Sequence, residues 1–128
     1  MKKLLSIVGV IAAVLILGIW ISNPLKAADK DKMGKPIPAN IMKIAEKSCM
    51  KCHASGGNGM ALSHLNLSNW DKYSAEKQAD KAAAMCKMVT KDKMPPKSFR
   101  EKNPNDVPTK DEIKQICDWS TSIMMPSK

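Results

Sequence analysis

The sequence predicts an all-α domain, and three observations lead to this fold class. Three segments repeat apolar or small residues at spacings of three and four, which is the period of one helix face. No segment alternates apolar and polar residues as a half-buried strand does. A proline-bearing stretch separates the last two helical segments, and no internal repeat is present. We therefore expect three or four helices and one long loop.

Residues 1–27 read as a signal peptide or a membrane anchor. Two lysines precede an 18-residue run of apolar and small residues from Leu4 to Ile21, and a polar exit follows. The length of the run and the poor small-x-small pattern before Ala27 favour a retained anchor. In either case the chain after residue 27 is exported, and we expect it in the periplasm.

Residues 28–38 are polar, with glycine and two prolines, and are expected to form a linker to a domain spanning residues 39–128. The exported part carries 18 basic and 12 acidic residues, a formal charge of +6. Nucleic acid is not an expected partner of an exported chain with so few aromatic residues. The basic side chains form either a solvated surface or a docking face for acidic redox partners. The densest group comprises Lys87, Lys91, Lys93, Lys97, Arg100 and Lys102.

The first expected helix spans residues 40–52, with Asn40 as its N-cap. Its spacing places Cys49 and Cys52 on the face that also carries the apolar residues. The glycines and the Asn58-Gly59 pair then predict a loop over residues 56–59. Residues 63–74 predict a turn of helix followed by a capped helix start.

The second expected helix spans residues 74–91, capped by Ser74. Four prolines predict an irregular loop from residue 92 to residue 108, of the kind that often carries function. The last helix opens with Thr109 and Glu112 in capping-box register. The expected inward stripes are Ala79, Ala82, Ala83, Cys86 and Val89 on the second helix, and Ile113, Ile116, Cys117, Ser120 and Ile123, beside Trp119, on the last.

The motif "CMKCH" carries the chemistry. Two thiols one helical turn apart, Cys49 and Cys52, can add to the two vinyl groups of a haem, and the adjacent His53 can then bind the iron. A zinc site would need a second pair of ligands, which the spacing of the remaining cysteines and of His64 does not provide. A thioredoxin-like dithiol would need a preceding strand. We therefore expect one covalent haem c, which would also enlarge a core with one Phe and one Tyr.

The opposite side of the iron needs a second ligand in an electron carrier. Met94 is our choice, because Pro95 and Pro96 stiffen the loop that holds its thioether. His64, Met60, Met88 or an open position are the alternatives. His/Met ligation predicts an electron carrier rather than an enzyme, whereas an open position predicts a haem peroxidase or a gas or redox sensor.

Three other residues are of interest. Cys86 and Cys117 are either two small buried side chains or a disulfide, which the oxidising compartment favours. Trp70 is expected to pack in the core, against the haem or the first helix.

From Cys49 to about Ser120 the chain resembles the small bacterial monohaem haem-binding domains of the cytochrome c superfamily. The matching segments are, in order, "CMKCH", "HLNLSNWDKYSAEKQ", "MPPKSF" and "PTKDEIKQICDW". The resemblance implies a cytochrome c-like helical fold, covalent haem at Cys49 and Cys52, His53 as proximal ligand and Met94 as distal ligand.

Overall fold

The computed structural model describes residues 34–124, and this part of the chain is helical with no strand. The expected all-α fold is therefore confirmed. Within the same residues no helix is both long and apolar enough to span a bilayer. The expected signal peptide or anchor at residues 1–27 lies outside the described residues.

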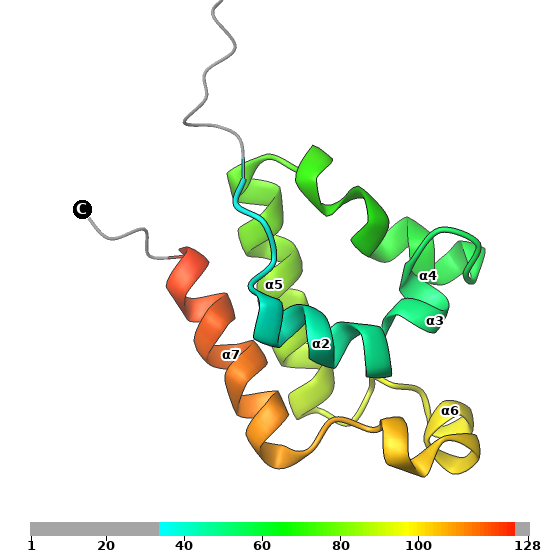
Figure 1. Ribbon diagram of the computed structural model, residues 1–128. Coiled ribbons are helices and arrows are strands. Elements are labelled where there is room, and N and C mark those ends of the chain that lie inside the picture. The colour runs from blue at the N-terminus through cyan, green and yellow to red at the C-terminus, as the bar shows by residue number, and fades with distance from the viewer. Residues whose placement is uncertain (1–33, 125–128) are drawn as a thin grey trace, which may run out of the picture.

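Three longer helices form the body of the domain, and short helices form one end of it. In Figure 1, α5 and α7 run side by side and α2 crosses them, while α3, α4 and α6 lie towards the other side of the molecule. The elements are α2 (Ala39–Ser48), α3 (Met50–His53), α4 (Gly59–His64), the 3-10 helix η2 (Leu67–Lys72), α5 (Ala75–Thr90), α6 (Lys97–Lys102), the 3-10 helix η3 (Pro104–Asp106) and α7 (Lys110–Met124).

The pairing of α5 with α7 is fixed by a disulfide. Cys86 and Cys117 are bonded, with their Cα atoms 4.8 Å apart. This settles the alternative that the sequence left open. Between the two helices lie Ala82 and Ile116, which are almost fully buried. The capping box at the start of α7 is confirmed, because Thr109 N–H donates to the Glu112 carboxylate and Glu112 N–H donates to Thr109 Oγ1.

The buried face of α5 is rotated from the expected one. Ser74 caps the helix as predicted, accepting from the N–H of Lys77. The buried residues, however, are Gln78, Ala82, Met85 and Val89. Gln78 is buried because its Nε2 donates to the carbonyl of Trp70 at 3.0 Å. The hydrogen bond allows the polar Gln78 side chain to be buried, which a search for apolar residues at helical spacing does not predict.

The first helix is shorter than expected. It begins after Pro38 and ends at Ser48, and Asn40 lies inside it, donating to the side chain of Gln115 rather than capping. Cys49 leaves the helical conformation at φ −124° before α3 begins. The break follows Ser48, whose hydroxyl donates to the carbonyl of Asp106 at 2.6 Å.

The segment 92–108 is not wholly irregular. A six-residue helix, α6, begins directly after Pro96, and η3 begins at Pro104. Proline stops a helix that precedes it but is tolerated at a helix start, and residues 97–102 contain none. The prolines here therefore mark where helices begin. Asn58 likewise caps α4, so the predicted loop at residues 56–59 ends in a helix start.

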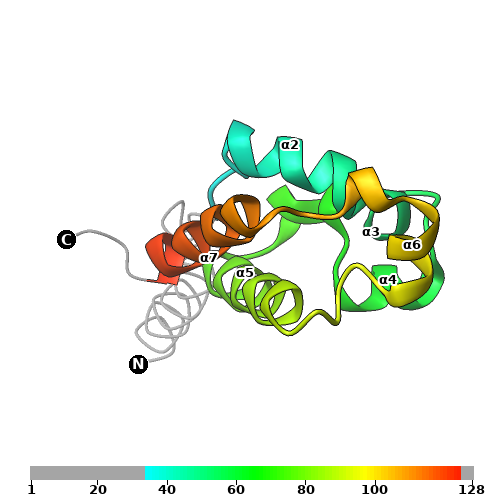
Figure 2. The ribbon, with the colours of Figure 1, turned by 90° about the horizontal axis from the view of Figure 1, so that it is seen from below.

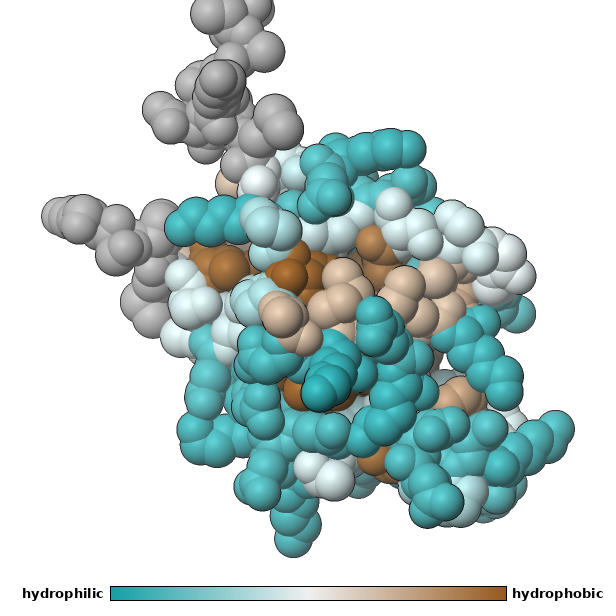
Figure 3. All heavy atoms as spheres, in the orientation of Figure 1, coloured by the Kyte–Doolittle hydropathy of each residue, from teal (hydrophilic) through white to brown (hydrophobic). Residues whose placement is uncertain are grey.

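Part of the expected linker packs on the domain. Ile37 is buried in the core, and the carbonyl of Lys35 accepts a hydrogen bond from Trp70 Nε1 at 2.9 Å. Figure 3 shows apolar side chains in a band across the middle of the face seen in Figure 1, with hydrophilic side chains over the lower part.

Candidate functional site

The two cysteines and the histidine of the CxxCH motif lie on one helical turn. The carbonyl of Cys49 accepts from the N–H groups of Cys52, at 3.1 Å, and His53, at 3.0 Å. Both thiols are free, and all three side chains are half-buried. This turn holds two sulfur atoms and an imidazole together on α3.

One nitrogen of His53 is already occupied. Its Nδ1 lies 3.0 Å from the carbonyl oxygen of Leu65. A carbonyl can only accept, so Nδ1 carries a proton and donates, and in the neutral imidazole the free lone pair is then on Nε2. A hydrogen bond of this kind orients a metal-binding imidazole and fixes its tautomer. His53 therefore offers Nε2 as a ligand.

The loop between His53 and Leu65 is closed by glycine and asparagine. Gly56 has φ +84°, in the left-handed region that favours glycine. At Gly57 a side chain would collide with the backbone of Cys52. The N–H of Asn58 donates to the Cys52 carbonyl at 3.1 Å, and the Asn58 side chain caps α4. The predicted turn therefore brings Asn58 back into contact with Cys52 and starts α4 beside the CxxCH turn.

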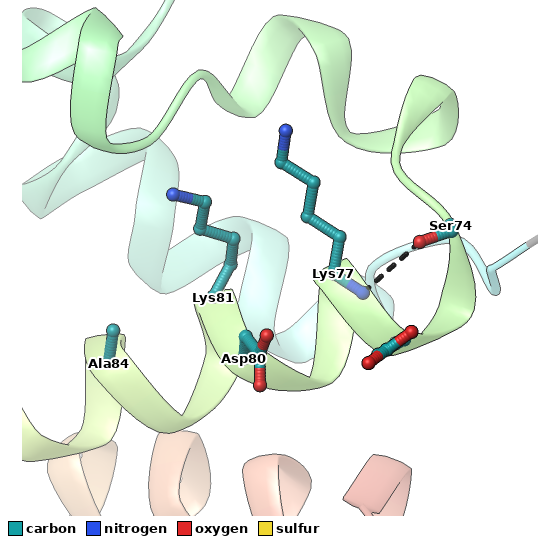
Figure 4. A pocket seen from close by; sticks show the side chains of 6 residues that line it. Ser74, Lys77, Asp80, Lys81 and Ala84 are labelled. Carbon is teal, nitrogen blue, oxygen red and sulfur yellow. Dashed lines mark hydrogen bonds between the residues drawn. The ribbon is translucent and has the colours of Figure 1, made fainter.

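Two lysines on α5 hold the segment that contains Leu65. Figure 4 shows Lys77 and Lys81 reaching from α5 towards this segment, along a shallow groove lined by residues of α5 and its cap. Lys81 Nζ donates to the carbonyl of His64, and Lys77 Nζ lies 5.0 Å from the centre of the Tyr73 ring. The residue next to Leu65 is thus tied to the longest helix of the described chain.

The thiol of Cys49 is protonated at neutral pH. Burial, with a smaller effect of the nearby Cys52, raises the pKa of Cys49 to about 11. A thioether to a vinyl group forms by net addition of S–H across the double bond, and Cys49 holds that proton.

Met94 lies in the short segment between α5 and α6. Its N–H donates to the carbonyl of Met88 at 3.2 Å, its side chain is half-buried, and Pro95 is buried. In Figure 1 and in Figure 2, α6, which follows Met94, lies on the same side of the molecule as α3. Lys51 of α3 lies 5.8 Å from the ring centre of Phe99 in α6. The fold therefore brings α6, which begins three residues after Met94, close to α3.

Arg100, on α6, carries a buried donor with no partner. Its Nε is shielded from solvent and makes no hydrogen bond within the described residues, although its terminal NH1 lies 3.6 Å from Asp92. An unpaired buried donor costs about 1–3 kcal/mol, and a carboxylate is the group that pairs best with it. Haem brings two carboxylates, so this donor fits the expected cofactor.

Two of the alternative ligands are exposed side chains. Met60 is 76% exposed, and His64 is exposed on α4. Met88 is half-buried, two residues after Cys86 on α5. For zinc, no group of three or more His, Cys, Asp or Glu gathers between residues 34 and 124, and Cys86 and Cys117 are taken by their disulfide.

Trp70 lies in the core, 3% exposed, with its ring centre 5.5 Å from that of Trp119. Its packing against a haem stays a prediction.

Sequence reasoning missed Leu65 and gave Arg100 no individual role. Leu65 acts through its backbone carbonyl, which no side-chain pattern reveals. Arg100 was one of six basic residues near Met94, and only the position of α6 singles it out.

One comparison with known proteins indicates haem binding by this domain. The model of a family described as "Haem-binding domain" matches residues 59–122, which is 64 of the 128 residues. The match includes Leu65, Trp70, Met94 and Arg100, and it begins six residues after His53. No curated protein and no solved structure matched the chain.

Proposed function

The chain belongs to the haem-binding domain family, and from this membership we propose that it is an electron-carrying c-type cytochrome with one covalently bound haem. The observation that carries the proposal is the CxxCH turn, where His53 donates through Nδ1 to Leu65 and keeps Nε2 for iron. Haem supplies a one-electron couple at its iron, and the residues below hold and tune it.

Cys49 and Cys52 would attach the haem as thioethers. Each thiol would add its S–H across one vinyl group, which needs neither an oxidant nor a reductant. The hydrogen bonds from the N–H groups of Cys52 and His53 to the Cys49 carbonyl keep both sulfurs beside the imidazole.

His53 and Met94 would bind the iron through Nε2 and the thioether sulfur. A neutral imidazole and a thioether favour the reduced iron and raise its potential, as suits a carrier. Arg100 would pair with a haem carboxylate through its buried Nε. We propose electron transfer without a catalysed reaction.

The location we propose is the periplasm, with residues 1–27 as an anchor or a cleaved signal peptide. The Cys86–Cys117 disulfide supports an oxidising compartment, since such bonds are rare in the cytosol. The basic surface supports an acidic redox partner protein.

The test is retention of haem after denaturation. We expect protein made with an intact export and haem-attachment system to give a pyridine haemochrome spectrum with one haem per chain. Cys49→Ala and Cys52→Ala should each lose a thioether and shift the α band, whereas the matched control Cys86→Ala/Cys117→Ala should leave the band unchanged. Haem that can be extracted from the denatured wild-type chain into acidified organic solvent would refute covalent attachment.

A further inference from the structure

The net charge of the described domain is concentrated in one short segment. Residues 34–124 contain 15 basic and 10 acidic residues, a difference of +5. Residues 87–102 alone contain 6 basic and 2 acidic residues, a difference of +4. The other 75 described residues therefore carry 9 basic against 8 acidic residues and are almost neutral.

This segment is also the one that holds Met94, with basic residues on both sides of it. We define the basic face as the five exposed lysines of the segment together with Lys51. Lys51 is part of α3, and its ammonium group lies over the ring of Phe99 in α6. Arg100 is left out, because its Nε is buried. The five lysines of the segment are Lys87, Lys91, Lys93, Lys97 and Lys102.

The charge of the basic face is little compensated. Lys97 pairs with Glu101 at 3.8 Å, but both side chains are more than half exposed, so the attraction between them is weak. Asp92 is engaged by Arg100. Within residues 34–124, Lys87, Lys91, Lys93 and Lys102 form no ion pair.

The basic face points away from the start of the described chain. In Figure 1 the first described segment, drawn in cyan before α2, begins at the top, and α6 lies at the bottom right.

We propose that the basic face is the docking surface for an acidic redox partner protein, which approaches over the Met94 side of the haem. This inference rests on the proposed electron-carrier function and names the surface through which electrons pass. A cluster of lysines around the segment that holds Met94 attracts an acidic partner protein and orients it. The partner would then make its closest approach to this protein beside the haem.

A partner protein is favoured over an anionic membrane. Membrane-surface binding by a basic element normally adds large apolar side chains that enter the bilayer interface. The large exposed apolar side chains of the described residues are Met60 and Met124, and neither belongs to the basic face.

The test compares two triple charge reversals in the full haem-loaded protein. The first is Lys91→Glu/Lys93→Glu/Lys102→Glu, within the basic face. The matched control is Lys43→Glu/Lys72→Glu/Lys110→Glu, at exposed positions outside it, with the same change of net charge. At low ionic strength we expect reduction of ferricyanide, an anionic probe, to slow about tenfold in the first variant and less than about twofold in the control. Hexaammineruthenium, a cationic probe, should show the reverse order.

A second measurement does not depend on the haem. Calorimetry with poly-L-glutamate should detect binding to the wild type and to the control variant, and weaker binding to the first variant, at matched ionic strength. Equal effects of the two triple variants in both assays would overturn the docking proposal and leave the haem proposal intact. If instead the protein proved to carry no covalent haem, but poly-L-glutamate still bound the wild type and the control more tightly than the first variant, the haem proposal would be overturned and the basic face would remain a binding surface for acidic partners. Binding of the wild type to phosphatidylglycerol vesicles, abolished only in the first variant, would assign the basic face to a membrane instead.

Discussion

His53 Nδ1 lies 3.0 Å from the carbonyl oxygen of Leu65, twelve residues further along the chain. Because the acceptor is a backbone atom held next to the end of α4, the orientation of the imidazole depends on how the chain folds back after the CxxCH turn. The ring is set by the protein before any ligand reaches Nε2.

Replacement of Met94 should alter the iron, because its thioether is the proposed sixth ligand. We expect Met94→Ala to lose the weak far-red band of a methionine–iron bond. Its reduction potential should fall by on the order of 0.1 V, within the range of about 0.8 V that axial ligands cover. Met60→Ala is the control, since Met60 is 76% exposed. An unchanged Met94→Ala spectrum would instead favour another ligand or an open position.

Arg100 is expected to keep a haem carboxylate ionised. In Arg100→Gln the carboxylate loses its charged partner, so its pKa should rise and the reduction potential should become pH-dependent between about pH 5 and pH 8. Arg100→Lys, which keeps the charge, should show a smaller change. Potentiometric titration at several pH values measures this, and identical profiles for all three proteins would contradict the role.

The disulfide should be a main source of stability. It closes a loop with a sequence separation of 31 residues, for which chain entropy predicts a contribution of about 3–4 kcal/mol. Cys86→Ser/Cys117→Ser should lower the free energy of unfolding in urea by about this amount. A thiol reductant should destabilise the wild type and leave the double variant unaffected.

The Lys47–Glu112 ion pair predicts a loss of stability in acid. Lys47 Nζ lies 2.8 Å from each carboxylate oxygen, and this hydrogen bonding, with that from the N–H of Thr109, lowers the pKa of Glu112 below its ordinary value. The stabilisation is therefore complete above the ordinary pKa of 4.5 and is lost as the pH falls through the lowered value.

Glu112→Gln should remove this contribution, about 1 kcal/mol, at pH 7, and should cost progressively less as the pH falls below 4.5. Urea unfolding of both proteins across this range checks the expectation. A constant difference between wild type and variant at every pH would show that the carboxylate charge is not its source.

Cys49 should react slowly with alkylating agents in protein prepared without haem. The reactive species is the thiolate, and a pKa of about 11 leaves very little of it at neutral pH. The rate of carboxyamidomethylation by iodoacetamide at Cys49, followed by peptide mass spectrometry, should still be rising at pH 10. A plateau below pH 9 would rule out the raised pKa.

Much of the fold could be predicted from local signals. Ser74, Thr109 and Glu112 form the caps that their residue types favour. The prediction failed where tertiary contacts decided the outcome. Ser48 is the last residue of α2, and its hydroxyl donates to the carbonyl of Asp106, 58 residues away. Gln78 is buried with its side-chain amide donating to the carbonyl of Trp70.

The site divides in the same way. Cys49, Cys52 and His53 are adjacent in sequence, so their grouping needed no knowledge of the fold. Leu65 contributes a carbonyl, and Arg100 contributes a donor whose burial follows from the position of α6. Periodicity does not reveal either of these, because each depends on contacts between distant segments.

The packing of residues 35–37 sets a practical limit for producing the domain by itself. A shortened form that starts at Ala39, the first residue of α2, would lack Ile37 and the carbonyl that receives the indole N–H of Trp70. Such a form would leave a cavity beside the tryptophan pair and a buried donor without an acceptor. An expression boundary for a soluble version therefore belongs upstream of Lys35, within the segment that composition alone marks as dispensable.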